Sequence, residues 1–120
     1  MKIILFFLVL STLLIPQDYK TPLEKSDFTE LTSYTALAKY VKSLPDFSKY
    51  IETDSVAQTV AERTIYFIRL SKRGFNKEKN KITLLITAQQ NGDEQASKEG
   101  ALLFLKKFAS HELDSLLEKV

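Results

Sequence analysis

The segment Gln89–Glu94 holds the polar side chains of this sequence that are best placed to do chemistry. It reads Gln-Gln-Asn-Gly-Asp-Glu, follows the apolar run Ile82–Ala88 and precedes a helical pattern. Open α/β sheets form their sites at such strand-to-helix junctions. Asn91 and Glu94 can converge across the turn and share a metal ion. A purely structural turn remains the alternative, with Asp93 as the helix N-cap and Glu94 favoured by the helix dipole.

Other potential catalytic groups stand alone in the sequence. His111-Glu112 begins a His-Glu-x-x-His pattern, but position 115 is Ser, so we interpret His111 as a solvated residue at a helix start. Asp54 and Ser55 have no His near them in sequence to complete a triad, and we interpret both as turn residues. The sequence contains no phosphate-binding glycine loop and no Gly-x-Ser-x-Gly nucleophile motif.

Length and composition exclude several classes of protein. A chain of 120 residues allows one domain at most, and 44% hydrophobic with 27% charged residues excludes a disordered chain and a multi-span membrane protein. The net charge of +2 argues against a nucleic-acid partner. With no Cys and a single His, the chain has no disulfide, no thiolate zinc knot and no His-rich metal cage.

Residues 1–16 are predicted to be a secretory signal peptide. Two residues supply a minimal positive start, Ile3–Ile15 is apolar or nearly so, and Pro16 ends the run. A membrane-spanning helix needs about 20 residues, so this run is too short to cross comfortably. No clear cleavage site precedes Gln17, which leaves an uncleaved anchor as the alternative. We therefore expect a secreted or periplasmic protein that touches a membrane only through this segment, if it stays attached.

The remaining chain divides into an extended lead-in at residues 17–31 and a partial α/β domain at residues 32–120. An apolar stripe from Tyr34 to Leu44 predicts a helix that starts at Thr32 or Ser33 and stops at Pro45. Tyr50–Val56 and Thr64–Ser71 are predicted strands, since β-forming residues dominate the second and apolar and charged residues alternate in the first.

The second half of the domain is predicted to contain a buried strand and a helix. Lys72–Lys81 has charges of both signs and indicates the solvated tip of a hairpin. Ile82–Ala88 is nearly all apolar, which favours a strand buried on both faces. The helix spans Glu94–Ser110, where Gly100 suggests close packing against a strand. His111–Val120 adds a further helical turn or two.

Three stretches of the sequence resemble the carboxypeptidase A-like zinc metallocarboxypeptidases. The run ITLLITAQQNGDEQASKEGALLFLKKFA is similar to their first zinc-ligand segment, where an apolar strand leads into Gln-Gln-His-Gly-Asn/Asp-Glu and a helix with a Lys-Glu-(Gly/Ala)-Ala-Leu core. Residues 31–34 (Leu-Thr-Ser-Tyr) resemble the opening of that catalytic domain, and residues 59–66 resemble its Ser-Val-Glu-Gly-Arg-x-Ile-Tyr hairpin. The resemblance covers about residues 21–120.

The resemblance implies the fold class and the metal. It implies an α/β fold in which helix, β-hairpin, buried strand and helix form the truncated N-terminal part of a mixed-sheet domain. It also implies Zn²⁺, with Glu94 at the position of the zinc-binding Glu. Asn91 stands where the zinc-binding His would be, and an amide is a poorer zinc ligand than imidazole. Glu62 likewise replaces the usual Gly before Arg63.

The activity implied by the resemblance is hydrolysis of the C-terminal peptide bond of peptides or proteins. The second His, the residues that bind the substrate carboxylate and the general-base Glu would all lie beyond Val120. We therefore expect no catalytic residue within this chain and no activity from it alone. The alternative is a degenerate, non-catalytic binding protein on the same scaffold, which the replacement at Asn91 supports.

Overall fold

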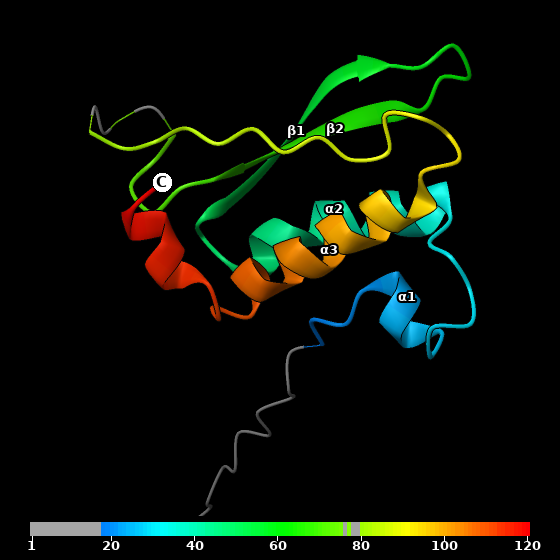
Figure 1. Ribbon diagram of the computed structural model, residues 1–120, viewed down its shortest axis with the longest axis horizontal. Coiled ribbons are helices and arrows are strands. Elements are labelled where there is room, and N and C mark those ends of the chain that lie inside the picture. The colour runs from blue at the N-terminus through cyan, green and yellow to red at the C-terminus, as the bar shows by residue number, and fades with distance from the viewer. Residues whose placement is uncertain (1–17, 76, 78–79) are drawn as a thin grey trace, which may run out of the picture.

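The computed structural model of the chain describes residues 18–75, 77 and 80–120. The predicted signal at residues 1–16 lies outside the described residues. The elements are α1 (Pro22–Lys25), α2 (Tyr34–Phe47), β1 (Ile51–Gln58), β2 (Thr64–Leu70), α3 (Gln95–Ala109) and the 3₁₀ helix η1 (Asp114–Glu118). Within the described chain, β1 and β2 form a two-stranded antiparallel sheet, and α2 and α3 lie to one side of it (Figure 1). The α/β class is therefore confirmed.

None of the helices in the described ranges is long and apolar enough to cross a membrane.

Helix α2 begins as predicted but continues past its proline. The Ser33 hydroxyl accepts a hydrogen bond from the Ala36 amide at the N-terminus, whereas Pro45 lies inside the helix, which ends at Phe47. A proline in a helix removes the bond to the carbonyl four residues earlier. Here that carbonyl belongs to Val41, and the Thr53 hydroxyl of β1 donates to it at 3.1 Å. The prediction of a stop at Pro45 was wrong because a neighbouring strand replaces the missing donor.

The hairpin joins two strands at the predicted places. Ile51 is buried, while Glu52 on the opposite face bonds to Arg69 of β2, its cross-strand partner, at 3.1 Å. The register shifts between Ser55 and Ala57, and the strand then continues to Gln58. The turn between the strands holds Glu62 at φ +57°, a left-handed conformation that favours glycine. Glu62 therefore holds a strained backbone conformation in this turn.

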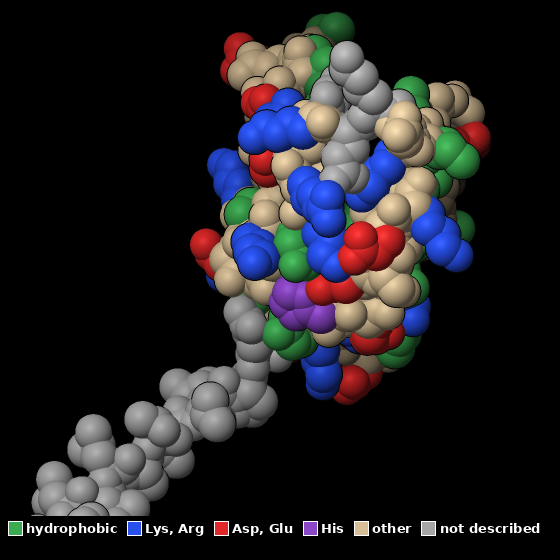
Figure 2. Space-filling view, turned by 90° about the vertical axis from the view of Figure 1, so that its left-hand side faces the viewer, with side chains coloured by type: hydrophobic (Ala, Val, Ile, Leu, Met, Phe, Trp, Pro, Cys, Tyr) green, Lys and Arg blue, Asp and Glu red, His purple; other side chains and the backbone are tan. Residues whose placement is uncertain are grey.

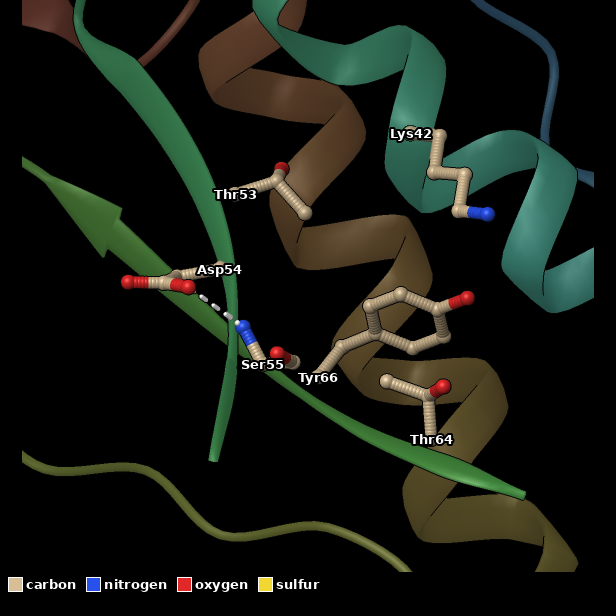
Figure 3. A pocket seen from close by; sticks show the side chains of 6 residues that line it. All are labelled: Lys42, Thr53, Asp54, Ser55, Thr64 and Tyr66. Atoms are coloured by element: carbon tan, nitrogen blue, oxygen red, sulfur yellow. Dashed lines mark hydrogen bonds between the residues drawn. The ribbon is translucent and has the colours of Figure 1, made fainter. Parts of the chain in front are cut away.

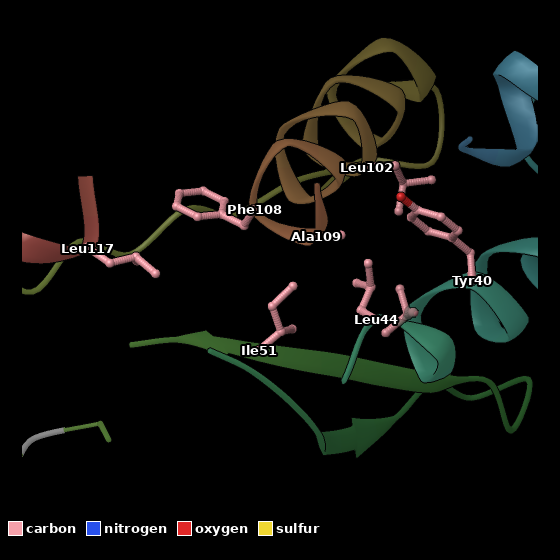
Figure 4. Close-up of a cluster of buried hydrophobic side chains, with 8 residues drawn as sticks. Tyr40, Leu44, Ile51, Leu102, Phe108, Ala109 and Leu117 are labelled. Atoms are coloured by element: carbon pink, nitrogen blue, oxygen red, sulfur yellow. The ribbon is translucent and has the colours of Figure 1, made fainter. Parts of the chain in front are cut away.

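The hydrophobic core lies where α2, β1, α3 and η1 meet (Figure 4). Its fully buried large side chains include Leu44 of α2, Phe108 of α3 and Leu117 of η1. The Phe104 and Phe108 rings of α3 stack edge to face at 5.1 Å between centroids. The predicted helix and the predicted helical turn after it are confirmed, since both contribute buried side chains. The remaining core members are Tyr40, Val41, Ile51, Leu102 and Ala109.

The lead-in is not extended throughout, because it contains α1. Thr21 and Glu24 form a capping box around Pro22, the first residue of that helix. The Glu24 carboxylate also accepts a bond from Lys106 of α3 at 2.5 Å. Desolvation raises the pKa of Glu24, but the bonds from Lys106 and Thr21 outweigh it and hold the pKa below its usual value. The short helix therefore fastens the start of the described chain to α3.

The predicted strand Ile82–Ala88 is not formed. The segment is extended but pairs with no other strand, and Ile82, Leu84, Leu85 and Ile86 are 55–73% exposed. A strand buried on both faces needs neighbours on both edges and a layer over each face. The described chain supplies only α3 and one hairpin. The prediction was wrong because an apolar run shows only that a segment can be buried. The described chain has too few neighbouring elements to bury this one.

Two smaller predictions in this half also fail. The described part of Lys72–Lys81 closes no hairpin, since residues 82–88 are not a strand. A Cβ atom added at Gly100 would meet nothing within 4 Å, so close packing against a strand does not explain that glycine. Both corrections follow from the missing strand.

Candidate functional site

Asn91 and Glu94 meet across the turn that leads into α3. The Asn91 side-chain amide donates to the Glu94 carboxylate at 2.7 Å, and both residues are exposed. The Glu94 amide donates to the Asn91 carbonyl at 3.1 Å, which closes the turn. The N-cap of α3 is Glu94 and not Asp93, and no side chain caps the helix. The turn thus brings together the two residues that the sequence paired, and places the carboxylate at the positive end of the helix.

The chain enters this turn through a strained residue. Gln89 adopts φ +53°, a left-handed conformation that costs a non-glycine residue roughly 1–2 kcal/mol. Its amide donates to the Ser97 hydroxyl at 2.8 Å, and that hydroxyl donates to the Glu94 carbonyl at 2.8 Å. Ser97 therefore ties the incoming chain to the first turn of α3 and fixes the direction from which Asn91 arrives.

The start of α3 is anchored by a buried ion pair, Lys98–Glu99, that encloses Thr32. The Glu99 carboxylate accepts bonds from the Thr32 amide and from its hydroxyl, each at 2.7 Å. The Lys98 ammonium donates to the Thr32 carbonyl at 2.5 Å and to the Gln95 side chain at 2.6 Å. Lys98 is 7% exposed and Glu99 5% exposed. We call Thr32, Lys98 and Glu99 the clasp; it holds the first turns of α3 against the entry to α2.

The three sequence stretches that carry the family resemblance meet in space through this anchor. Thr32 of the first stretch is held by Lys98 and Glu99 of the last. The Tyr34 hydroxyl accepts a bond from the amide of Thr64, which belongs to the hairpin stretch, at 2.7 Å. Desolvation raises the pKa of Tyr34, but its hydrogen bonds with Thr64 outweigh this and lower it overall. The resemblance therefore describes one connected structural unit.

The described residues do not assemble a zinc site. No group of three or more His, Cys, Asp or Glu side chains lies close enough together, within the described ranges, to hold a metal ion. At the turn itself, the Asn91 amide directs its nitrogen to the Glu94 carboxylate, so the side chain acts as a hydrogen-bond donor there. Zinc sites need three protein ligands or four. Glu94 alone supplies too few ligands to hold a zinc ion.

The other candidates from the sequence take structural positions. His111 follows the C-terminus of α3 at φ +64°, and its ring nitrogen lies 2.9 Å from the Asp114 carboxylate. It is thus at a helix end and not at a helix start. Figure 2 shows this His side chain, the single one of the chain, on a face where basic and acidic side chains alternate.

Asp54 and Ser55 belong to β1 and not to a turn, which corrects the sequence interpretation. They line an open hollow of about 370 Å³ between α2 and the hairpin (Figure 3). The Asp54 carboxylate accepts a bond from its neighbour's amide at 2.8 Å and another from Arg69 at 3.4 Å. No His is among the residues that line this hollow. The hollow therefore contains no nucleophile–base pair.

Sequence reasoning missed the role of the clasp. Lys98-Glu99 was noted only as part of a family-like helix core, because two charged residues in a helix usually mark a solvated face. One signal could have found it. Lys98 and Glu99 precede Ala101 and Leu102, so they begin the helical face that packs inward, where a charge needs a partner.

These features define an α/β domain with a carboxylate at the start of a helix, anchored by a buried ion pair to the helix before its hairpin. Residues 34–120 match the zinc carboxypeptidase family (Peptidase_M14), so the chain belongs to that family. No curated protein and no solved structure matches the chain.

Proposed function

We propose that this chain forms the N-terminal part of a secreted zinc metallocarboxypeptidase-type domain and contributes Glu94 as one zinc ligand. The observation that carries the proposal is the family match over residues 34–120, which includes the exposed Glu94 carboxylate at the start of α3. The family match places the chain among zinc carboxypeptidases. A complete domain of this type would hydrolyse C-terminal peptide bonds of peptides or proteins.

The chain alone is proposed to be inactive. Glu94 is a single carboxylate, and the amide of Asn91 offers zinc much less than an imidazole does. Two ligands on one turn cannot close a tetrahedral site, so zinc binding would need further donors besides Asn91 and Glu94. The contribution of residues 32–120 is then to hold the turn in place through the clasp and Ser97.

Metal stoichiometry after dialysis tests this proposal. We expect no retained zinc in the 120-residue chain, and no gain from Asn91→His in it. In a chain extended to the full length of the domain, Asn91→His should raise both the zinc content and the release of a C-terminal residue from a blocked dipeptide. Glu94→Gln is the matched control that should remove the gain.

Two outcomes would contradict the proposal. Full zinc occupancy in the short wild-type chain would show that the site is complete without further ligands. In the extended chain, an Asn91→His variant that binds no more zinc than wild type would show that this turn is not the metal site.

The second candidate function is a non-catalytic binding scaffold of the same family. The observation that favours it is the direction of the Asn91 amide, whose nitrogen already satisfies the Glu94 carboxylate. In that case the extended wild-type chain would bind the C-terminus of a peptide without zinc and without cleaving it. Equilibrium binding of a blocked dipeptide in the presence of a chelator separates this function from the first.

A further inference from the structure

Asn91 and Gly92 form the one Asn-Gly pair of the sequence. The other asparagines, Asn76 and Asn80, are each followed by a lysine. The side-chain amide carbon of an asparagine can be attacked by the main-chain nitrogen of the next residue, and glycine leaves that nitrogen most accessible because it has no side chain. Asn91 stands at the position of the zinc-binding His in the family resemblance, so this replacement itself creates the reactive pair.

The turn at the start of α3 presents both reacting groups to solvent. Asn91 and Gly92 are exposed, and no hydrogen bond to another described residue occupies the Gly92 amide. The groups around that amide are held in place, since the Glu94 amide donates to the Asn91 carbonyl at 3.1 Å and the Gln95 side chain donates to the Gly92 carbonyl at 2.9 Å. These contacts join residues three positions apart, so they belong to the turn itself and do not depend on the sheet.

We propose that Asn91 is a deamidation site, and that its conversion to aspartate or isoaspartate breaks the contact with Glu94 and loosens the start of α3. The proposal is carried by the Asn-Gly pair and by the contacts of one turn. It does not depend on zinc binding.

The reaction takes two steps and needs only water. In the first step the Gly92 nitrogen forms a bond to the Asn91 Cγ atom, the Cγ–Nδ2 bond breaks, and Nδ2 leaves as ammonia with the proton of the Gly92 amide. In the second step water adds to either carbonyl carbon of the resulting succinimide ring, and the bond from that carbon to the Gly92 nitrogen breaks. Addition at Cγ gives aspartate, and addition at the main-chain carbon gives isoaspartate. Nothing is oxidised or reduced.

Both products lose the group that contacts Glu94 now. The Asn91 Nδ2 atom donates to the Glu94 carboxylate at 2.7 Å, and this nitrogen is the atom that leaves. Aspartate instead places a second negative charge beside Glu94, and like charges at this distance repel each other. Isoaspartate also adds a carbon to the main chain, inside the turn that the Glu94 amide closes onto the Asn91 carbonyl. Deamidation therefore removes a contact that holds the first turn of α3.

Mass spectrometry of the full 120-residue chain, incubated at neutral pH, tests the reaction. A digest at glutamates releases residues 79–94 as one peptide, which contains Asn80 and Asn91 together. We expect both aspartate and isoaspartate at Asn91, while Asn80, which is also exposed, stays largely intact.

Gly92→Ala is the matched variant for the reaction rate. Gly92 is not in the left-handed conformation, and a Cβ atom added there meets nothing within 4 Å, so the turn accepts alanine without strain. The added methyl group hinders attack by the main-chain nitrogen. We expect deamidation to slow about tenfold, which corresponds to a barrier higher by about 1.4 kcal/mol.

Urea unfolding of the deamidated chain, separated from the intact chain by ion exchange, tests the structural consequence. The equilibrium constant for unfolding should rise about fivefold relative to the chain before incubation, as the loss of one hydrogen bond predicts. The Gly92→Ala chain, incubated in parallel, should keep the constant that it had at the start.

Three results would overturn the proposal. Equal deamidation at Asn80 and Asn91 would show that the turn has no selective reactivity. Aspartate without isoaspartate would show direct hydrolysis of the side chain and not attack by the Gly92 nitrogen. Unchanged stability of the deamidated chain would show that the contact between Asn91 and Glu94 does not hold the start of α3. None of these measurements involves zinc, so their failure is distinguishable from a failure of the proposed function.

Discussion

Leu44 and Leu85 are the same residue type in two regions of the molecule that differ in how far they are covered from solvent. Leu44 is 0% exposed between α2, β1 and α3, whereas Leu85 is 73% exposed in an extended segment that only α3 and one hairpin approach. The region around Leu44, which we call the closed region, has a helix or strand on every side. The region around segment 82–88, which we call the open region, has apolar residues but lacks the elements that would cover them. The comparison shows that burial in this chain is decided by available partners and not by local hydrophobicity.

The candidate site lies at the border of these two regions. Glu94 begins α3, whose first turns are held in the closed region by the clasp. Asn91 arrives at the end of the open segment 82–88. One member of the pair is therefore positioned rigidly by its helix, while the other depends on a segment that has no sheet around it. Completing the open region should affect Asn91 more than Glu94.

The largest expected effect comes from breaking the clasp in the closed region. Glu99→Ala leaves the Thr32 amide and hydroxyl without their acceptor and the Lys98 ammonium buried without its counter-ion, which should cost about 3–5 kcal/mol in the free energy of unfolding. Urea unfolding followed by circular dichroism measures it. Glu112→Ala is the control, since that carboxylate is exposed and its loss should change little. Equal effects of the two variants would contradict the clasp.

The next largest effect is expected from the same Leu→Ala substitution made once in each region. Leu44→Ala should destabilise the chain by about 3 kcal/mol, because it leaves a cavity in a closed core. Leu85→Ala should stay within about 0.5 kcal/mol, because the side chain is already largely in water. Urea unfolding gives both free energies. A cost at Leu85 close to that at Leu44 would mean that the segment is buried in solution.

A smaller effect tests the contact that lets α2 pass Pro45. Thr53→Val removes the hydroxyl that donates to the Val41 carbonyl, with a loss of about 1 kcal/mol. Thr83→Val in the open segment is the control and should be neutral. If the Val41 carbonyl loses its only replacement donor, the last turn of α2 should also exchange its amide hydrogens faster. Unchanged amide exchange at residues 44, 46 and 47 would argue that Thr53 is not needed there.

The sequence predicted the closed region well because its signals are local. The stripe ending at Leu44 and the alternation around Ile51 report faces that the structure buries, and the β-rich run of β2 packs partly buried side chains against the same core. The capping box at Thr21 and Glu24 was equally local, yet it was overlooked in a polar lead-in. The passage of α2 beyond Pro45 was not predictable locally, since its reason is a hydroxyl on the next strand.

The open region shows the opposite case. The run Ile82–Ala88 carries the pattern of a buried strand, and the pattern alone does not tell whether neighbouring strands are present. The convergence of Asn91 and Glu94 was predictable from their spacing across a turn. The clasp that fixes Glu94 was not predictable from the sequence. Its hydrogen bonds join Thr32 to Lys98 and Glu99, which lie 66 and 67 positions away along the chain.

The smallest expected effect concerns the hairpin turn, where the family-like Gly is replaced by Glu62. The residue sits at φ +57°, where a side chain costs roughly 1–2 kcal/mol, while glycine would pay roughly 0.5–1 kcal/mol in unfolded-state entropy. Glu62→Gly should therefore stabilise the chain by about 0.5–1 kcal/mol, measured by thermal and urea unfolding. Gly100→Ala is the reciprocal control: no neighbour would contact the added methyl group, so removing that helical glycine should also stabilise. A loss of stability in Glu62→Gly would mean that residue 62 does not adopt the left-handed conformation in solution.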